Sequence, residues 1–157
     1  MADLVVTITE SVTLNGTARG SSNALTISGV DDVYHRIITC PANNETRLVD
    51  FHSSVADAVV SAMDVQHVKY IRVTNLDTTN AVTLNMQVDR GEDDTAADES
   101  ASLLLEAKKS FMMGVPNDGI GISDTDANLV TDLVDLESLV IFTGGAAIDV
   151  EIFIASV

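Results

Sequence analysis

The chain has 157 residues, a length typical of one domain, and 46% of them are hydrophobic, so a core can form without covalent or metal cross-links. Its 24 acidic and 8 basic residues give a formal net charge of -16, which argues against nucleic acid and anionic membranes as partners. The single cysteine, Cys40, excludes an internal disulfide and a cysteine-based zinc cluster, and we expect it to be a small buried hydrophobic residue.

The hydropathy of the sequence argues against a membrane-spanning or secreted protein. Apolar runs stay well short of the about 20 residues needed to cross a bilayer. The first ten residues, M-A-D-L-V-V-T-I-T-E, lack the basic start and long apolar stretch of a signal peptide. We therefore expect no membrane partner and a soluble protein that folds in a cytoplasm. Because Trp is absent and aromatic residues make up only 4%, the core should be built from Val, Ile, Leu and Met.

The first half of the chain favours short strands. The segment Leu4–Leu14 is rich in Val, Thr and Ile and ends at the turn dipeptide Asn15-Gly16. Its apolar residues lie near the terminus, so Met1–Leu14 could pair outside its own sheet as an exchanged strand, which deletion of residues 1 to 8 would test. Further strands are predicted at Ala24–Ile27, Val33–Cys40 and Arg47–Phe51.

The middle of the chain predicts one helix and then a hairpin. Val55–Met63 has apolar residues at near-helical spacing, and Ser54 with Asp57 can form a capping pair. Alternation with a period of two comes next in Lys69–Asn75 and Ala81–Val88, and the polar segment L-D-T-T-N between them predicts a hairpin turn. The residues expected to face inward are Ile71, Val73, Val82, Leu84, Met86 and Val88.

The next segments carry mixed signals. Asp89–Glu99 is long, acidic and poor in apolar residues, so it predicts a solvated loop. Glu99–Lys109 contains strong helix formers, but we favour a strand, a turn at Glu106-Ala107-Lys108 and a second strand through Ser110-Phe111-Met112. Asn128–Glu137 favours a helical turn, because its leucines lie three or four residues apart.

The carboxyl end repeats the hairpin pattern and completes the fold prediction. Leu139–Thr143 is apolar, Gly144-Gly145 permits the positive dihedrals of a tight turn, and Ile148–Ala155 alternates again. Eight to ten short strands at such intervals predict an all-β fold. We expect one domain over residues 1–157, an antiparallel two-sheet β-sandwich that is jelly-roll-like and has at most one or two short helices.

Catalytic and cofactor-binding residues are not indicated by any local motif. The histidines His35, His52 and His67 lie in or beside predicted strands without a second ligand at metal-binding spacing, so no metal is expected there. The sequence also lacks the G-x-S-x-G turn that presents a nucleophilic serine. We therefore predict no enzyme activity, no cofactor and no catalytic site.

Acidic clusters raise the question of calcium. Asp124, Asp126 and Asn128 match the opening of an EF-hand loop, but Leu129 stands at the glycine position and Asp135 where the bidentate glutamate belongs. That match fails at its most specific positions. A looser calcium site in the acidic loop stays open, although such a cluster is more often a solvated surface. Its carboxylates would be those of Glu92, Asp93, Asp94 and Asp98.

Three segments of the second half share a recognisable pattern. They are V-K-Y-I-R-V-T-N-L-D-T-T-N-A-V-T-L-N-M over Val68–Met86, L-L-L-E-A-K-K-S-F-M-M over Leu103–Met113, and D-L-E-S-L-V-I-F-T-G-G-A-A-I-D-V-E-I-F-I over Asp135–Ile154. Together they resemble small virion structural proteins of tailed phages, especially those of marine cyanobacterial hosts. The resemblance is one of pattern and spans Val68–Val157. It implies a jelly-roll-like module on the outside of a virion, without catalytic residues.

This resemblance and the composition suggest several functions. The first is capsid decoration by a cement protein that bridges and stabilises major capsid subunits, as a homo-oligomer in which a trimer is favoured. The second is a component of the tail, neck or head fibre, again bound to other virion proteins. The third is a free-standing sugar- or calcium-binding β-sandwich, and an enzyme is the weakest alternative.

Overall fold

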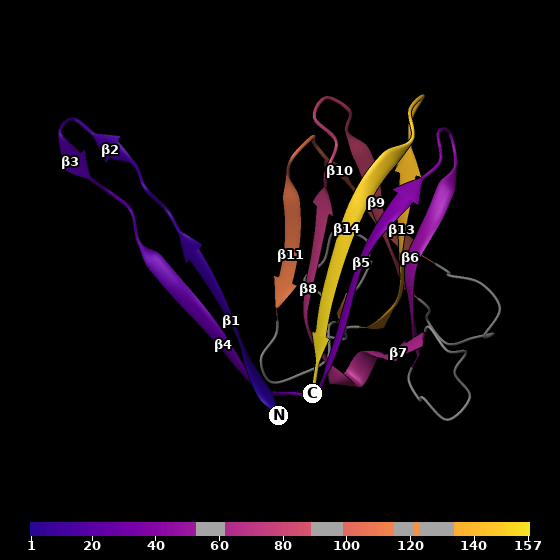
Figure 1. Cartoon of the computed structure of the whole chain (residues 1–157), viewed down its shortest axis with the longest axis horizontal. Coiled ribbons are helices and arrows are strands. Elements are labelled where there is room, and N and C mark those ends of the chain that lie inside the picture. Colours follow the sequence, from indigo (N-terminus) through magenta and orange to yellow (C-terminus); the bar gives the residue numbers. More distant parts are fainter. Residues whose placement is uncertain (53–61, 89–98, 115–120, 123–133) are drawn as a thin grey trace.

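Residues 1–52, 62–88, 99–114, 121–122 and 134–157 are described by the computed structural model, in which two β-sheets face each other and a long hairpin projects from their lower end (Figure 1). The first sheet, here the β14 sheet, has the order β11-β8-β14-β5. Its strands are Ser110–Gly114, Val68–Asn75, Ile148–Ser156 and Asp32–Cys40, in that order.

The second sheet, here the β13 sheet, has the order β10-β9-β13-β6-β7, and β12 also pairs with β13. Its strands in this order are Glu99–Leu105, Val82–Val88, Val134–Thr143, Glu45–His52 and Ala62–Asp64, with β12 at Gly121–Ile122. The pairs are antiparallel except β6 with β7, which run parallel.

The path of the chain through these sheets is that of a jelly roll. From β5 to β6, β8 to β9, β10 to β11 and β13 to β14 the chain leaves one sheet and enters the other, while β9 and β10 pair within one sheet. Two four-stranded antiparallel layers built in this way, β5-β14-β8-β11 and β6-β13-β9-β10, define the jelly-roll arrangement. The predicted all-β, jelly-roll-like sandwich is therefore confirmed.

Two predicted hairpins are wrong in their pairing, although their strands are right. β8 and β9 lie in opposite sheets, and so do β13 and β14, so each connection crosses the sandwich instead of joining neighbours. Alternation shows which face of a strand is apolar, but it does not show which strand lies beside it. Gly144 and Gly145 also lack the expected positive φ, because the described glycines with positive φ are Gly16 and Gly29. The turn between β10 and β11 lies where predicted, with Lys108 at φ 60°.

The core between the sheets is aliphatic, as the composition predicts. In β14 the side chains of Ile148, Val150, Ile152 and Ile154 are at most 2% exposed, whereas Asp149 on the other face is exposed. The inward residues predicted for β8 and β9 are also buried, apart from Met86, which is partly buried against the same core. The period of two therefore identified the core face of these strands correctly. The buried cluster also contains Cys40, as expected.

A buried amide holds the β8–β9 connection in place. Asn75 is 0% exposed, and its Nδ2 donates hydrogen bonds to the carbonyl oxygens of Asn80 (2.8 Å) and Leu105 (3.1 Å). Its Oδ1 accepts a hydrogen bond from the backbone N–H of Asp77 (2.9 Å). A buried amide is tolerated only when it is hydrogen-bonded. These bonds therefore hold the β8–β9 connection against the end of β10.

Helical structure in the described ranges consists of the 3-10 helix η2, Val65–His67, whose N-cap Asp64 accepts a hydrogen bond from the N–H of Gln66 (3.0 Å). The helix predicted over Val55–Met63 falls mostly on residues outside the described ranges, and its last two residues belong to β7.

The helical turn predicted over Asn128–Glu137 falls outside the described ranges up to residue 133 and is wrong from Val134 onward. That part is strand β13, whose register against β9 shifts between Leu136 and Ser138. The irregularity lets Leu136 and Leu139 both face the core, at 1% and 0% exposure, although they lie three residues apart. The helical prediction rested on Leu129, Leu133 and Leu136, and of these Leu136, which the structure describes, lies in a strand.

Residues 2–30 form the projecting hairpin, here called the arm. β1 (Ala2–Thr9) pairs antiparallel with β4 (Ser22–Val30), and the short strands β2 (Thr13–Leu14) and β3 (Thr17–Ala18) form its tip. The strands predicted in this region are thus present. β1 does lie outside both sandwich sheets, but its partner in the structure is β4 of the same chain.

Candidate functional site

The tip of the arm is closed by the turn that the sequence predicted. Asn15 and Gly16 have φ values of 51° and 78°, the left-handed pair that a two-residue hairpin turn requires. Behind the tip, the N–H of Arg19 donates to the carbonyl of Val12 (2.7 Å), and the N–H of Glu10 donates to the carbonyl of Ser21 (2.8 Å). These bonds carry the ladder from β2–β3 into β1–β4, so the arm is one continuous ribbon.

Between the β2–β3 pair and the β1–β4 pair, a glycine allows the two sides of the hairpin to approach each other. A Cβ placed on Gly20 would collide with the carbonyl oxygen and carbon of Glu10, which are backbone atoms and cannot rotate away. We define this point, Gly20 beside Glu10, as the waist of the arm. Only glycine fits there without moving the backbone.

At the root of the arm, a bulge sets the angle at which the ribbon leaves the sandwich. The β1–β4 register shifts between Ala2, opposite Val30, and Leu4, opposite Ile27, which places one additional residue in β4. Gly29 in this stretch has a φ of 84°, a conformation that glycine adopts without strain. Bulges of this kind bend a strand and so change the direction in which the ribbon continues.

The root is anchored by a second hydrophobic cluster, separate from the main core. Ile27 and Val30 of β4 pack with Tyr70 of β8 and Ala155 of β14, and all four are at most 7% exposed. The partly buried residues around them are Leu4, Val6, Leu25, Phe153 and Val157. Leu25 also lies close to Gly114 of β11, where an added Cβ would come within 3.1 Å of its Cδ2. The root is therefore seated on the outer face of the β14 sheet.

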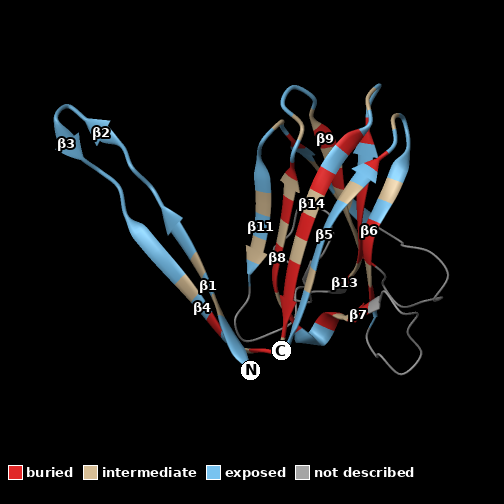
Figure 2. Ribbon diagram, in the orientation of Figure 1, coloured by how far each residue is buried: buried red, intermediate tan, exposed pale blue. Residues whose placement is uncertain are grey.

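Beyond the root, the arm keeps its apolar side chains in water (Figure 2). Val5, Ile8, Val12 and Leu14 are 56%, 48%, 53% and 57% exposed. A two-stranded ribbon has no second layer to cover such residues and is marginally stable alone. An exposed apolar surface on a projecting element is typical of a contact site for another protein.

The charge of the arm differs from that of the rest of the chain. Residues 1–30 contain Asp3, Glu10 and Arg19 as their only charged residues, a net charge of -1. The arm thus holds 2 of the 24 acidic and 1 of the 8 basic residues, which leaves 22 and 7, a net charge of -15, to residues 31–157. The arm can therefore approach another acidic protein with less repulsion than residues 31–157 taken together.

Apart from the bulge at its root, the arm lacks the features that usually block strand addition at an edge. Within the described residues, β4 pairs with β1 and with no further strand. Its nine residues, Ser22–Val30, contain no charged residue and no proline, and β1 carries a single charge at Asp3. Exposed edges are normally protected by lysine, proline, bulges or covering loops. The arm therefore presents long edges that are open to another strand.

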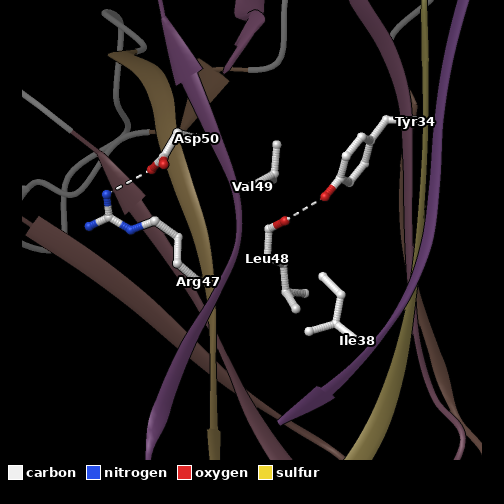
Figure 3. Close-up of a pocket in the computed structure, with 6 residues that line it drawn as sticks. All are labelled: Tyr34, Ile38, Arg47, Leu48, Val49 and Asp50. Carbon is white, nitrogen blue, oxygen red and sulfur yellow. Dashed lines mark hydrogen bonds and ion pairs between the residues drawn. The ribbon is translucent and has the colours of Figure 1, made fainter. Parts of the chain in front are cut away.

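A hollow of about 210 Å³ opens between β5, an edge strand of the β14 sheet, and β6, beyond which the described part of the β13 sheet has only the short strand β7 (Figure 3). The hydroxyl of Tyr34 bridges the two sheets by donating to the carbonyl of Leu48 (3.3 Å), and the Arg36 guanidinium lies 5.3 Å from the Tyr34 ring centroid. Arg47 and Asp50 form an ion pair at its rim (2.7 Å). The residues lining this hollow, here called the slot, are Tyr34, Ile38, Arg47, Leu48, Val49 and Asp50.

The outer face of the β14 sheet carries an ion-pair network beside the root of the arm. Glu151 accepts a hydrogen bond from Arg72 Nη1 (2.7 Å) and is 2.8 Å from His35 Nε2. The Arg72 hydrogen bond, followed by that of His35, lowers the pKa of Glu151 below its usual value of 4.5. The His35 ring also lies against Phe153, with ring centroids 5.7 Å apart. These contacts link β5, β14 and β8 across their outer face.

The structure separates the three histidines of the described chain. His35 is in β5, His52 ends β6 and His67 is in η2, where its Nδ1 lies 3.6 Å from an Asp64 carboxylate oxygen. In the described ranges no three His, Cys, Asp or Glu residues lie close enough together to hold a metal ion. Both calcium candidates, the acidic loop and the segment from Asp124 to Asn128, fall outside the described residues.

The sequence contains a signal for the weakly charged arm but none for the slot. The sparse charge of the first 30 residues is a visible signal for the arm, although the sequence-based expectations did not use it. The slot has no such signal, because it forms where two strands of different sheets end up as neighbours. In the parts of the chain that are described, no helix is both long and apolar enough to cross a membrane.

Comparison with known proteins adds one distant likeness. No protein-family model and no curated protein matches the chain. One solved structure, described as "Bacillus endospore appendages form a novel family of disulfide-linked pili", is 12% identical and covers 100% of this chain and 92% of its own, with a TM-score of 0.42. A TM-score of this size does not establish a common fold, so the jelly-roll assignment rests on strand order.

Proposed function

We propose that this chain is a non-enzymatic structural protein that joins neighbours in a larger particle through its arm. The observation that carries the proposal is the projecting ribbon, whose apolar side chains are about half exposed and whose edges bear almost no charge. Beyond its root, the ribbon adds little to the stability of a monomer, because its apolar side chains there stay exposed. A protein that must hold neighbours together gains a contact that reaches beyond its own body.

The particle we propose is the virion of a tailed phage, and the role is capsid decoration. This assignment is supported by the resemblance over Val68–Val157 to small virion proteins, combined with a rigid jelly-roll body and an arm for contact. Each arm contact would be of modest area, but several copies on one lattice multiply the affinity. The partner of the arm or the body in that setting would be the major capsid protein.

The experiment uses empty expanded capsids assembled without this protein, to which the purified full chain is added. We expect binding at saturable sites and a higher temperature of capsid disruption. A variant with Ile8→Asp and Leu14→Asp should bind much less, because charge on the arm opposes its burial. The matched control is Leu104→Asp, since Leu104 is a 64% exposed leucine on β10, far from the arm in sequence and in the other sheet. An unchanged disruption temperature with the unmodified chain would reject capsid decoration.

A tail, neck or head-fibre component is the second candidate, and the arm is the feature that favours it. An element that reaches from one body to the next repeats around an axis and closes into a ring when the rotation permits. Electron micrographs of labelled particles separate the two roles. Label over the whole capsid lattice supports decoration, whereas label confined to one vertex, the tail or the fibres supports the second candidate.

A further inference from the structure

We infer that the arm of one copy docks on a second copy of this chain, adding to the free edge of β5 with its apolar side chains over the slot. This rests on the proposed function in one respect, that the arm is the element of contact. It goes further by naming the partner and both surfaces. The receiving surface is β5, Asp32–Cys40, together with the slot between β5 and β6.

β5 is a suitable receiving edge because one side of it is unpaired and it carries two exposed aliphatic side chains. Among the described residues it pairs with β14 alone, so its other edge offers free N–H and C=O groups. Val33 and Ile37 are 47% and 63% exposed beside that edge. A strand added there would place alternate side chains over the slot and the others beside Val33 and Ile37.

The outer half of the arm has the matching pattern. Ile8, Val12 and Leu14 occupy even positions, the same parity as Leu4 and Val6, which turn toward the chain's own sandwich at the root. In extended chain, even positions share one face, so the ribbon carries an apolar face that is covered at its root and exposed farther out. Such a face complements a narrow hollow lined by Tyr34, Ile38 and Leu48.

The arm cannot fill the slot of its own chain. Its root is seated on Tyr70 of β8 and next to Gly114 of β11, and from there the ribbon extends away from the body on the β11 side (Figure 1). β5 is at the opposite edge of the β14 sheet from β11. The receiving edge must therefore belong to another molecule.

Charge permits a second copy to be that molecule, and the same chain supplies both apolar surfaces. Two bodies of net charge -15 repel each other, but an arm of net charge -1 can reach from one to the other while the bodies stay apart. The arm and β5 each carry exposed large apolar residues. In this arrangement the two groups belong to the same contact. Because the two groups differ, the contact is head-to-tail and gives a closed ring or an open chain of copies.

The test is a cysteine mixing experiment on the full chain. Thr13→Cys and Ile37→Cys variants, one isotope-labelled, are mixed and oxidised gently, and the disulfide-linked species are identified by mass. Thr13 is exposed in β2 and lies on the face of the arm opposite to Leu14, the face that would lie beside Ile37. Cys40 is left in place because it is 0% exposed and burial raises the pKa of its thiol, so it reacts slowly. The control partner is Leu104→Cys on β10.

We expect Thr13–Ile37 heterodimers to exceed Thr13–Leu104 heterodimers by about tenfold or more, because docking holds the first pair of thiols at a high effective concentration. Equal yields would overturn the inference, and so would a predominance of Thr13–Thr13 dimers, which would indicate pairing of arm with arm. Ile37→Asp without any cysteine change should return the native mass to the 16.6 kDa of one chain. Capsid binding is measured separately, so loss of the capsid role leaves this result interpretable.

Discussion

Gly20 and Glu10 approach so closely across the arm that a single methyl group on Gly20 would overlap the Glu10 carbonyl. Gly20→Val should therefore separate the two sides of the hairpin at its waist. We expect assembly of copies to be lost while the free energy of unfolding of the sandwich changes by less than about 0.5 kcal/mol, the usual range for substitutions outside a core. Sedimentation and thermal unfolding measure the two effects.

A matched glycine supplies the control for that experiment. Gly144 lies in the β13–β14 connection, has no positive φ and has no heavy atom within 4 Å of an added Cβ. Gly144→Ala should be neutral in both assays. Loss of assembly in this variant as well would mean that the arm is not the cause.

The root of the arm predicts a local loss of stability. Ile27 is 3% exposed and packs on Tyr70 and Ala155, so Ile27→Ala removes buried methyl groups where the arm meets its own sandwich. A buried Ile→Ala change costs about 2–5 kcal/mol. Amide exchange in β1 and β4 should accelerate by roughly thirtyfold or more, since about 1.4 kcal/mol corresponds to a factor of ten.

Amides in β14 and β13 should exchange at an unchanged rate in the Ile27→Ala variant. Leu14→Ala is the comparison, because Leu14 is 57% exposed at the tip and its loss leaves the root intact. Faster exchange throughout the sandwich would show that arm and body unfold as one unit, which is inconsistent with two separate hydrophobic clusters.

The sandwich core predicts the largest loss of stability. Leu139 is 0% exposed in β13, whereas Leu104 is 64% exposed in β10. Leu139→Ala should lower the free energy of unfolding by about 2–5 kcal/mol, and Leu104→Ala by less than about 0.5 kcal/mol. Denaturant titration of dilute protein measures both. Similar losses at the two positions would contradict the described packing of the sheets.

The Glu151 network predicts how stability depends on pH. The pKa of Glu151 in the folded chain is lowered, chiefly by the Arg72 hydrogen bond, so the charged form is favoured by folding. Its contribution is present above about pH 4.5, the usual value, and is lost as the pH falls through the lowered folded pKa. Glu151→Gln should reduce stability at neutral pH by up to about 1 kcal/mol, the scale of a solvent-screened ion pair.

The difference in unfolding free energy between the unmodified chain and Glu151→Gln should shrink as the pH is lowered below about 4.5. Glu106→Gln, in the exposed turn after β10, serves as the comparison and should show little difference at any pH. A Glu151→Gln difference that grows on acidification would have the wrong sign for this network.

Much of the fold could be predicted from local patterns, because buried and exposed residues alternate along each strand of a sandwich. The strands β8, β9 and β14 and their core faces are indicated directly by Ile71, Leu84 and Ile152, each in a run of inward residues at every second position. Their pairing is not, because a strand with one apolar face fits either sheet. The start of β13 was predicted wrongly, because Leu129, Leu133 and Leu136 lie three or four residues apart, a spacing that fits a helix.

The candidate contact surface was only partly predictable. The Asn15-Gly16 turn and the apolar start of the chain indicated a strand able to pair outside the sandwich. That β1 would instead pair with β4 depends on residues 13 to 28 apart in sequence. That the ribbon would be seated on Tyr70 depends on Ile27, which lies 43 residues before it. The slot depends on Tyr34 and Leu48 meeting across two sheets, a relationship that exists only after folding.

The most direct measurement of the central claim, that the arm makes the contact, is amide hydrogen exchange of the full chain in its single and assembled states. The claim predicts that assembly slows exchange in residues 2–30 and in β5, while β9 and β10, on the far sheet, change little. Unchanged exchange in residues 2–30 on assembly, with protection elsewhere, would contradict it.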